Sequence, residues 1–171
     1  CENEKTAVNK AVSLAQTWLD AVTSFPAHTT QSFAWSRIEW IETTMPIWQR
    51  LVEPIAKKVQ GNLGTNLEGL VQGEGLPPEM MAMITPMMSA LEPMSTAMFN
   101  MQVGNGIGEL AKDVLFLNGI GHPLANFLRP ALLPRNIREF AQGIHLEDSE
   151  VLLFLSSREA AASRLFSNPD R

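Results

Sequence analysis

The stretch EDSEVLLFLSSREAAASRLF, residues Glu147–Phe166, is predicted to form the last helix of the chain. At about 100° per residue, its apolar residues gather on one face. That face holds Phe154, Leu165, Arg158, Val151, Ala162, Leu155, Phe166, Glu159 and Leu152, whereas Ser156, Ser157, Ser163 and Arg164 fall on the other side. Arg158 lies in the middle of the apolar face, and Glu159 lies nearer its edge. Because a buried charge needs a partner, the pattern predicts an ion pair in the core.

A second segment offers partners for these charges. Residues Thr30–Thr43 are predicted to form a helix in which Arg37 also lies in the middle of an apolar face. We therefore expect Arg37 or Arg158 to pair with a buried carboxylate, either Glu159 or Glu39. Two parallel hydrogen bonds from a guanidinium would make this structural ion pair specific to arginine.

The rest of the chain also shows helical patterns. The other predicted helices cover Glu4–Val22, Thr44 to about Gly61, a Met-rich region after Pro78, and Pro134–Gly143. Thr44 and Pro46 are typical of an N-cap and a first helical turn. No run of alternating β-branched residues is long enough to indicate a sheet. We expect an all-α fold with an orthogonal or bundle-like arrangement, in a single helical domain over residues 1–171.

Glycines define two further expectations. Between Gly61 and Pro78 the chain holds five glycines and two prolines, which predicts a flexible loop over about residues 61–78. Gly104 and Gly108 are four residues apart and are expected to let a neighbouring helix approach closely. Their spacing with Gly106 does not match a phosphate-binding loop, so a nucleotide site is not expected.

A Met-rich stripe runs along the middle of the chain at steps of three and four residues. It consists of Met80, Met83, Met87, Leu91, Met94, Met98 and Met101. We expect it to pack in the core, because methionine fills irregular gaps. The alternatives are a groove that accepts a partner helix, or a soft-metal site made of thioethers.

Charge and cysteine content narrow the classes of function. The chain has 13 Lys and Arg against 18 Asp and Glu, a net charge of −5, and no basic cluster, so nucleic acid is not an expected partner. No stretch is apolar enough to predict a membrane span. Cys1 is the single cysteine, which excludes an internal disulfide and favours a cytoplasmic protein. If Cys1 were a natural mature terminus, it would instead carry a lipid anchor.

Five segments, taken in order, resemble one protein family. They are AQTWLDAVTSFP (15–26), AWSRIEWIETTMPIWQRLVEPIAKKV (34–59), FNMQVGNGIGELAKDVL (99–115), LLPRNIREFAQG (132–143) and SSREAAASRLF (156–166). Together they look like the zincin-like metallopeptidase family of bacterial proteins, often labelled as hydrolases. The resemblance implies the helical part of a minimal zincin, and it predicts that this chain is a central portion of a longer protein.

The resemblance also implies a zinc site, which this chain lacks in part. Zincins place two histidines one turn apart in the motif HExxH, with the glutamate as general base. The motif aligns with Arg158–Ala162, where only Glu159 matches. The family commonly carries REAAH here, and this chain has Ala162 in place of the histidine. A third ligand would fall beyond Arg171.

Two functions follow from the resemblance. We expect no zinc in this chain and no peptidase activity, but a structural or protein-binding scaffold whose partner is the rest of its own polypeptide or another protein. The Met-rich stripe and the loop at 61–78 would form the contact surface. The alternative is a metal-dependent hydrolase of the peptidase type, with Glu159 as base or ligand and with His122 and His145 as metal ligands. The three histidines, His28 included, form no paired motif and are otherwise expected at the surface.

Overall fold

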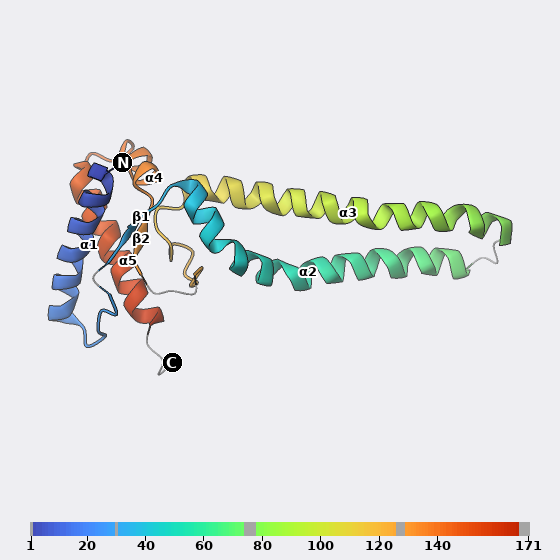
Figure 1. The fold of residues 1–171 in the computed structure, drawn as a ribbon, viewed down its shortest axis with the longest axis horizontal. Helices are drawn as coiled ribbons and strands as arrows, with labels where there is room; N and C mark the ends of the chain where they lie inside the picture. The colour runs from blue at the N-terminus through green and yellow to red at the C-terminus, as the bar shows by residue number, and fades with distance from the viewer. Residues whose placement is uncertain (1, 30, 74–77, 126–128, 168–171) are drawn as a thin grey trace. The chain divides into compact units, whose positions relative to one another are not determined.

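The computed structural model of the chain describes residues 2–29, 31–73, 78–125 and 129–167, with the side chains of residues 59–92 left out. Its elements are α1 (Glu2–Val22), β1 (Phe33–Ala34), α2 (Arg37–Gly73), α3 (Pro78–Asp113), β2 (Ala131–Leu132), α4 (Pro134–Ala141) and α5 (Asp148–Phe166). Most of the described backbone is helical (Figure 1), which confirms the predicted all-α fold. The chain divides into two compact units: unit 1 comprises Cys1–Met45 and Glu109–Arg171, and unit 2 comprises Pro46–Gly108.

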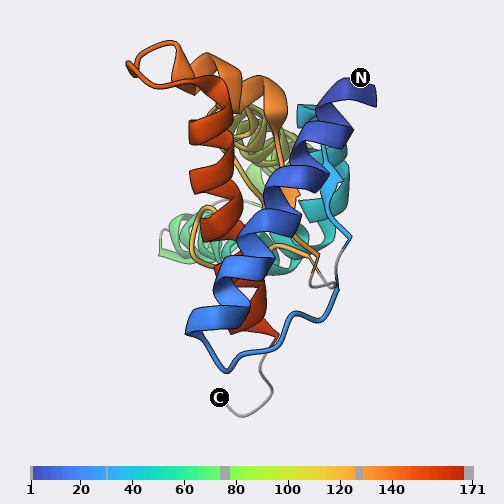
Figure 2. The ribbon, with the colours of Figure 1, turned by 90° about the vertical axis from the view of Figure 1, so that its left-hand side faces the viewer.

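Unit 1 is built around the packing of α1 against α5, which lie side by side (Figure 2). Its core is a cluster of buried apolar side chains from both helices, α4 and the segments between: Val8, Val12, Phe116, Leu132, Ile137, Ala141, Val151 and Leu155. Strands β1 and β2 pair in parallel, with Phe33 beside Ala131 and Ala34 beside Leu132. This short sheet connects the segment before α2 to the segment before α4.

The first and last residues of helices α1 and α5 lie close to the predicted ones. The apolar residues Val8, Val12 and Ala15 of α1 are all buried, as their spacing indicates. Helix α5 begins directly after Glu147, whose backbone N–H donates to the carboxylate of Glu150 at 3.4 Å. This contact is half of a capping box, so local sequence sets the start of α5.

The buried face of α5 differs from the predicted one. Its buried residues are Val151, Leu155, Ser156, Glu159, Ala160, Ser163 and Arg164. Phe154 is 62% exposed and Arg158 is also exposed, so the expectation that Arg158 lies in the core was wrong. The packed face carries many small side chains, which let neighbouring elements approach the helix. A face chosen by hydrophobicity alone misses this kind of packing.

Helix α2 is continuous across two predicted boundaries. The hydroxyl of Thr44 donates to the carbonyl of Trp40 at 2.8 Å, so Thr44 lies inside the helix and is not an N-cap. Residues 61–73, predicted as part of a loop, are also helical. Each glycine weakens a helix by only about 1 kcal/mol, and leucines at steps of four and three favour the helix there. Residues 74–77 of the predicted loop lie outside the described residues.

Helix α3 carries the Met-rich stripe. Met94, Met98 and Met101 are 61%, 49% and 61% exposed, so the expectation of core packing was wrong for these three residues. The side chains of residues 80–91 in the stripe lie outside the described part of the structure. Neither α3 nor any other described helix is long and apolar enough to cross a membrane.

The glycines of α3 have no close neighbours. Among the described residues, a Cβ atom added at Gly104, Gly106 or Gly108 would meet nothing within 4 Å beyond the local helix backbone, so the expected close approach of another helix was wrong. Gly104→Ala is therefore expected to raise the free energy of unfolding by about 0.5–1 kcal/mol in urea denaturation. Gly121 is the control, because its φ of 77° makes Gly121→Ala destabilising by about 1–2 kcal/mol. A destabilised Gly104→Ala variant would contradict this assignment.

Candidate functional site

Glu159 is a fully buried carboxyl group at the centre of α5. Its Oε2 accepts the backbone N–H of Asn118 at 3.1 Å. Its Oε1 accepts the side-chain amide of Asn118 at 2.9 Å and the backbone N–H of Ala131 at 3.3 Å. The same amide of Asn118 lies 3.4 Å from the hydroxyl oxygen of Ser163. The carboxyl group therefore connects α5 to β2 and to the segment that follows α3.

The electrostatics of Glu159 follow from this burial. Desolvation raises the pKa of its carboxyl group from 4.5 to about 8, although the hydrogen bonds from Asn118 and Ala131 act in the opposite direction. At pH 7 the carboxyl group is therefore mostly protonated. A general base must be ionised and within reach of the proton that it removes. Glu159 is mostly protonated at pH 7 and has no exposed surface, so it meets neither condition in this conformation.

Arg158 and Ala162, at the two ligand positions of the zincin motif, face a different space. They line a hollow of about 460 Å³ between α5, the end of α1 and the segment that follows α1. The lining residues are Leu19, Thr23, Phe25, Arg158, Ala161, Ala162, Arg164 and Leu165. Glu159 is not among them. In an HExxH site the base and both ligands must reach the same metal-bound water. Here the carboxyl group of Glu159 accepts hydrogen bonds from Asn118 and Ala131 instead.

The side chains around this hollow do not fit zinc. A guanidinium is positively charged and offers no lone pair, so Arg158 and Arg164 repel a cation. His122 and His145 are exposed and do not line the hollow. Within residues 2–29, 31–73, 78–125 and 129–167, no group of three His, Cys, Asp or Glu side chains is placed to hold a metal ion. Cys1 lies outside the described residues.

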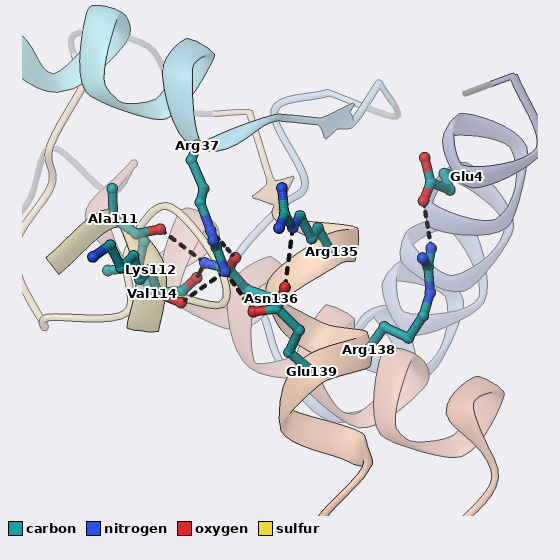
Figure 3. A network of polar contacts seen from close by, with 9 residues as sticks. All are labelled: Glu4, Arg37, Ala111, Lys112, Val114, Arg135, Asn136, Arg138 and Glu139. Atoms are coloured by element: carbon teal, nitrogen blue, oxygen red, sulfur yellow. Dashed lines mark hydrogen bonds and ion pairs between the residues drawn. The ribbon is translucent and has the colours of Figure 1, made fainter. Parts of the chain in front are cut away.

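Arg37 belongs to a polar network around α4 (Figure 3). Its Nε donates to the side-chain oxygen of Asn136 at 2.7 Å, and its Nη2 donates to Glu139 at 2.5 Å. The amide of Asn136 donates in turn to the carbonyls of Ala111 and Val114 at 2.9 and 2.6 Å. The network joins the start of α2, the end of α3 and α4.

The structure does not bring together the four residues of the expected ion pair. In the described part of the chain, no hydrogen bond or ion pair joins any two of Arg37, Arg158, Glu39 and Glu159. Glu39 accepts the backbone N–H of Ser36 at 2.7 Å, and this hydrogen bond lowers the pKa of Glu39. The guanidinium of Arg158 lies 5.6 Å from the centroid of the Phe116 ring.

Arg37→Met is expected to lower the free energy of unfolding by about 1–2 kcal/mol, because the buried oxygen of Asn136 would lose its charged donor. The ion pair with Glu139 adds little, since it is partly exposed to solvent. Arg135→Met is the matched control: Arg135 contacts the same carboxylate without touching Asn136, and its loss should change stability by less than about 0.5 kcal/mol. Equal losses in urea denaturation would contradict this assignment.

Arg164 is the buried arginine that the helical pattern misses. It is 3% exposed, and its Nε and Nη2 donate to the side-chain oxygen of Gln16 at 2.8 and 2.5 Å. Its Nη1 donates to the carbonyl of Phe25 at 3.0 Å, and Nη2 also donates to Asp20 at 2.7 Å. In the sequence, the polar residues Gln16 and Asp20 are one helical turn apart, and this spacing could have indicated a site for a guanidinium group. The contacts fasten the end of α5 to α1.

Comparison with known proteins places this architecture in a family. A search of curated proteins and a search of solved structures each found no match. The family model described as zincin-like metallopeptidase matches residues 1–169, which is nearly the whole chain. The match agrees with the resemblance carried by the five sequence segments. The chain belongs to the zincin-like metallopeptidase family.

Proposed function

We propose that this chain is a zincin-family protein without peptidase activity, in which α5 acts as a structural helix of a protein-binding scaffold. The observation that carries the proposal is the orientation of Glu159. Its carboxyl group is held by Asn118 and Ala131, away from the hollow that Arg158 and Ala162 line. Glu159, the residue that could act as a base, therefore does not line the hollow that contains the two metal-ligand positions.

The polar contacts of α5 support a scaffold role. Glu159 binds the backbone of Asn118 and Ala131, and Arg164 binds Gln16 and the carbonyl of Phe25. One helix thus fixes α1, β2 and the segment after α3 through directional contacts. Buried polar networks of this kind specify one arrangement, because any other leaves buried groups without partners.

Helix α3 supports the protein-binding part of the proposal. Met94, Met98 and Met101 follow one another at steps of four and three, and each is about half exposed or more. Flexible methionine side chains suit surfaces that adapt to a protein partner. We assign this stripe to contact with the rest of the polypeptide or with another protein.

Hydrolysis of fluorescein-labelled casein at pH 7, with added zinc, tests the proposal. The expected rate equals that of zinc in buffer, and it stays the same in the Glu159→Gln variant. Zinc-dependent hydrolysis that both a chelator and Glu159→Gln abolish would contradict the proposal. The function would then be the metal-dependent hydrolase, and His122→Ala and His145→Ala would show whether these histidines hold the metal.

A further inference from the structure

We propose that the hollow between α1 and α5 binds a small molecule with an apolar body and one carboxylate. Its volume of about 460 Å³ lies within the range of small-molecule sites, roughly 300–1,000 Å³. Its walls are mostly apolar, from Leu19, Phe25, Ala161, Ala162 and Leu165. This inference is independent of the scaffold role, because it concerns only the space beside α5.

Arg158 supplies the group that recognises the carboxylate. Its side chain is exposed and lines the hollow, and in the described part of the chain it forms no ion pair with a carboxylate. Its guanidinium carbon lies 5.6 Å from the centroid of the Phe116 ring. A guanidinium carries five N–H donors, and two of them can bind a carboxylate side by side. Arg164 cannot take this role, because its N–H groups already donate to Gln16, Asp20 and Phe25.

The walls favour a compact ligand over an extended peptide. Peptides that bind in extended form use backbone hydrogen bonds to a strand edge. The hollow is lined by two helices and the segment after α1, and among the described residues of its wall Thr23 is the one with a neutral polar side chain. The alanines Ala161 and Ala162 leave space for an apolar body beside the guanidinium. An apolar chain that ends in a single carboxylate matches this distribution.

Isothermal titration calorimetry with octanoate and with 1-octanol tests the proposal on the whole chain. We expect octanoate to bind at one site per chain and at least about tenfold more tightly than octanol, the difference that one charge-assisted contact produces. Arg158→Met should bring the two affinities within about threefold. Lys10→Met is the control, because Lys10 is exposed on α1, does not line the hollow and carries the same charge.

Ala162→Leu should weaken both ligands by about tenfold or more, since the added side chain fills the hollow. Circular dichroism establishes that this variant is folded, and the Arg158 variant remains a test if it is not, because Arg158 is exposed. No saturable binding of octanoate to the native chain would overturn the proposal. An Arg158→Met variant that keeps the same preference as Lys10→Met would overturn it as well.

Discussion

Replacing Arg164 by methionine is expected to lower the free energy of unfolding by roughly 3–5 kcal/mol. The guanidinium is almost fully buried, and its removal would leave the side-chain oxygen of Gln16 and the carbonyl of Phe25 without their donor. Methionine retains much of the apolar volume, so the loss reports the polar contacts rather than a cavity. Urea denaturation followed by circular dichroism measures the difference.

Arg158→Met is the matched control, because it makes the same chemical change in the same helix. Arg158 is exposed, and its guanidinium lies over the Phe116 ring, so its loss should lower stability by less than about 1 kcal/mol. Comparing the loss of unfolding free energy in the two variants therefore shows which of the two arginines is buried in the core. A loss below about 1 kcal/mol for Arg164→Met would contradict the contacts described for α5.

Glu159→Gln is expected to remove a fall in stability between about pH 5 and pH 8. The pKa of Glu159 is raised from 4.5 to about 8, so in this window the folded chain keeps a proton that the unfolded chain has released. The stabilisation is fully present below pH 4.5 and is lost as the pH rises through 8. Its slope is at most about 1.4 kcal/mol per pH unit. Glutamine cannot titrate, so this contribution should vanish.

Glu139→Gln is the control for this titration. The pKa of Glu139 is lowered by hydrogen bonds from Arg135 and Arg37, so its contribution to stability is lost only as the solution becomes acidic. The fall from pH 5 to pH 8 should persist in this variant. Denaturation curves at several pH values compare the two substitutions. The raised pKa of Glu159 would be contradicted if the stability of the native chain did not change between pH 5 and pH 8. It would also be contradicted if the Glu159→Gln variant kept the fall in stability.

The sequence predicts the helical parts of the fold well where local signals act alone. The spacing of Val8, Val12 and Ala15 locates α1, and the last helix, predicted over Glu147–Phe166, corresponds to α5. The break predicted at Thr44 fails because a threonine can bond a carbonyl of its own helix as well as cap the next one. The same threonine can cap a helix or lie within one, and the local sequence alone does not distinguish the two.

The candidate site was predicted only in part. The sequence singled out Glu159 as a buried carboxyl group, and the structure buries it. Its partners are Asn118, after α3, and Ala131 of β2, and not an arginine. One feature of the sequence could have indicated Asn118 as a partner: it is a polar residue directly after the apolar run 114–117. Arg164 was assigned to the outer side because a helical wheel weighs hydrophobicity and takes no account of partners on other helices. Such partners depend on tertiary contacts, which one sequence does not specify.

The zinc content of the purified chain tests the central claim most directly. The chain is exposed to zinc, dialysed against metal-free buffer and analysed by elemental mass spectrometry. We predict zinc far below one ion per native chain, with the same content in the Glu159→Gln variant. Near-stoichiometric zinc in the native chain would contradict the account.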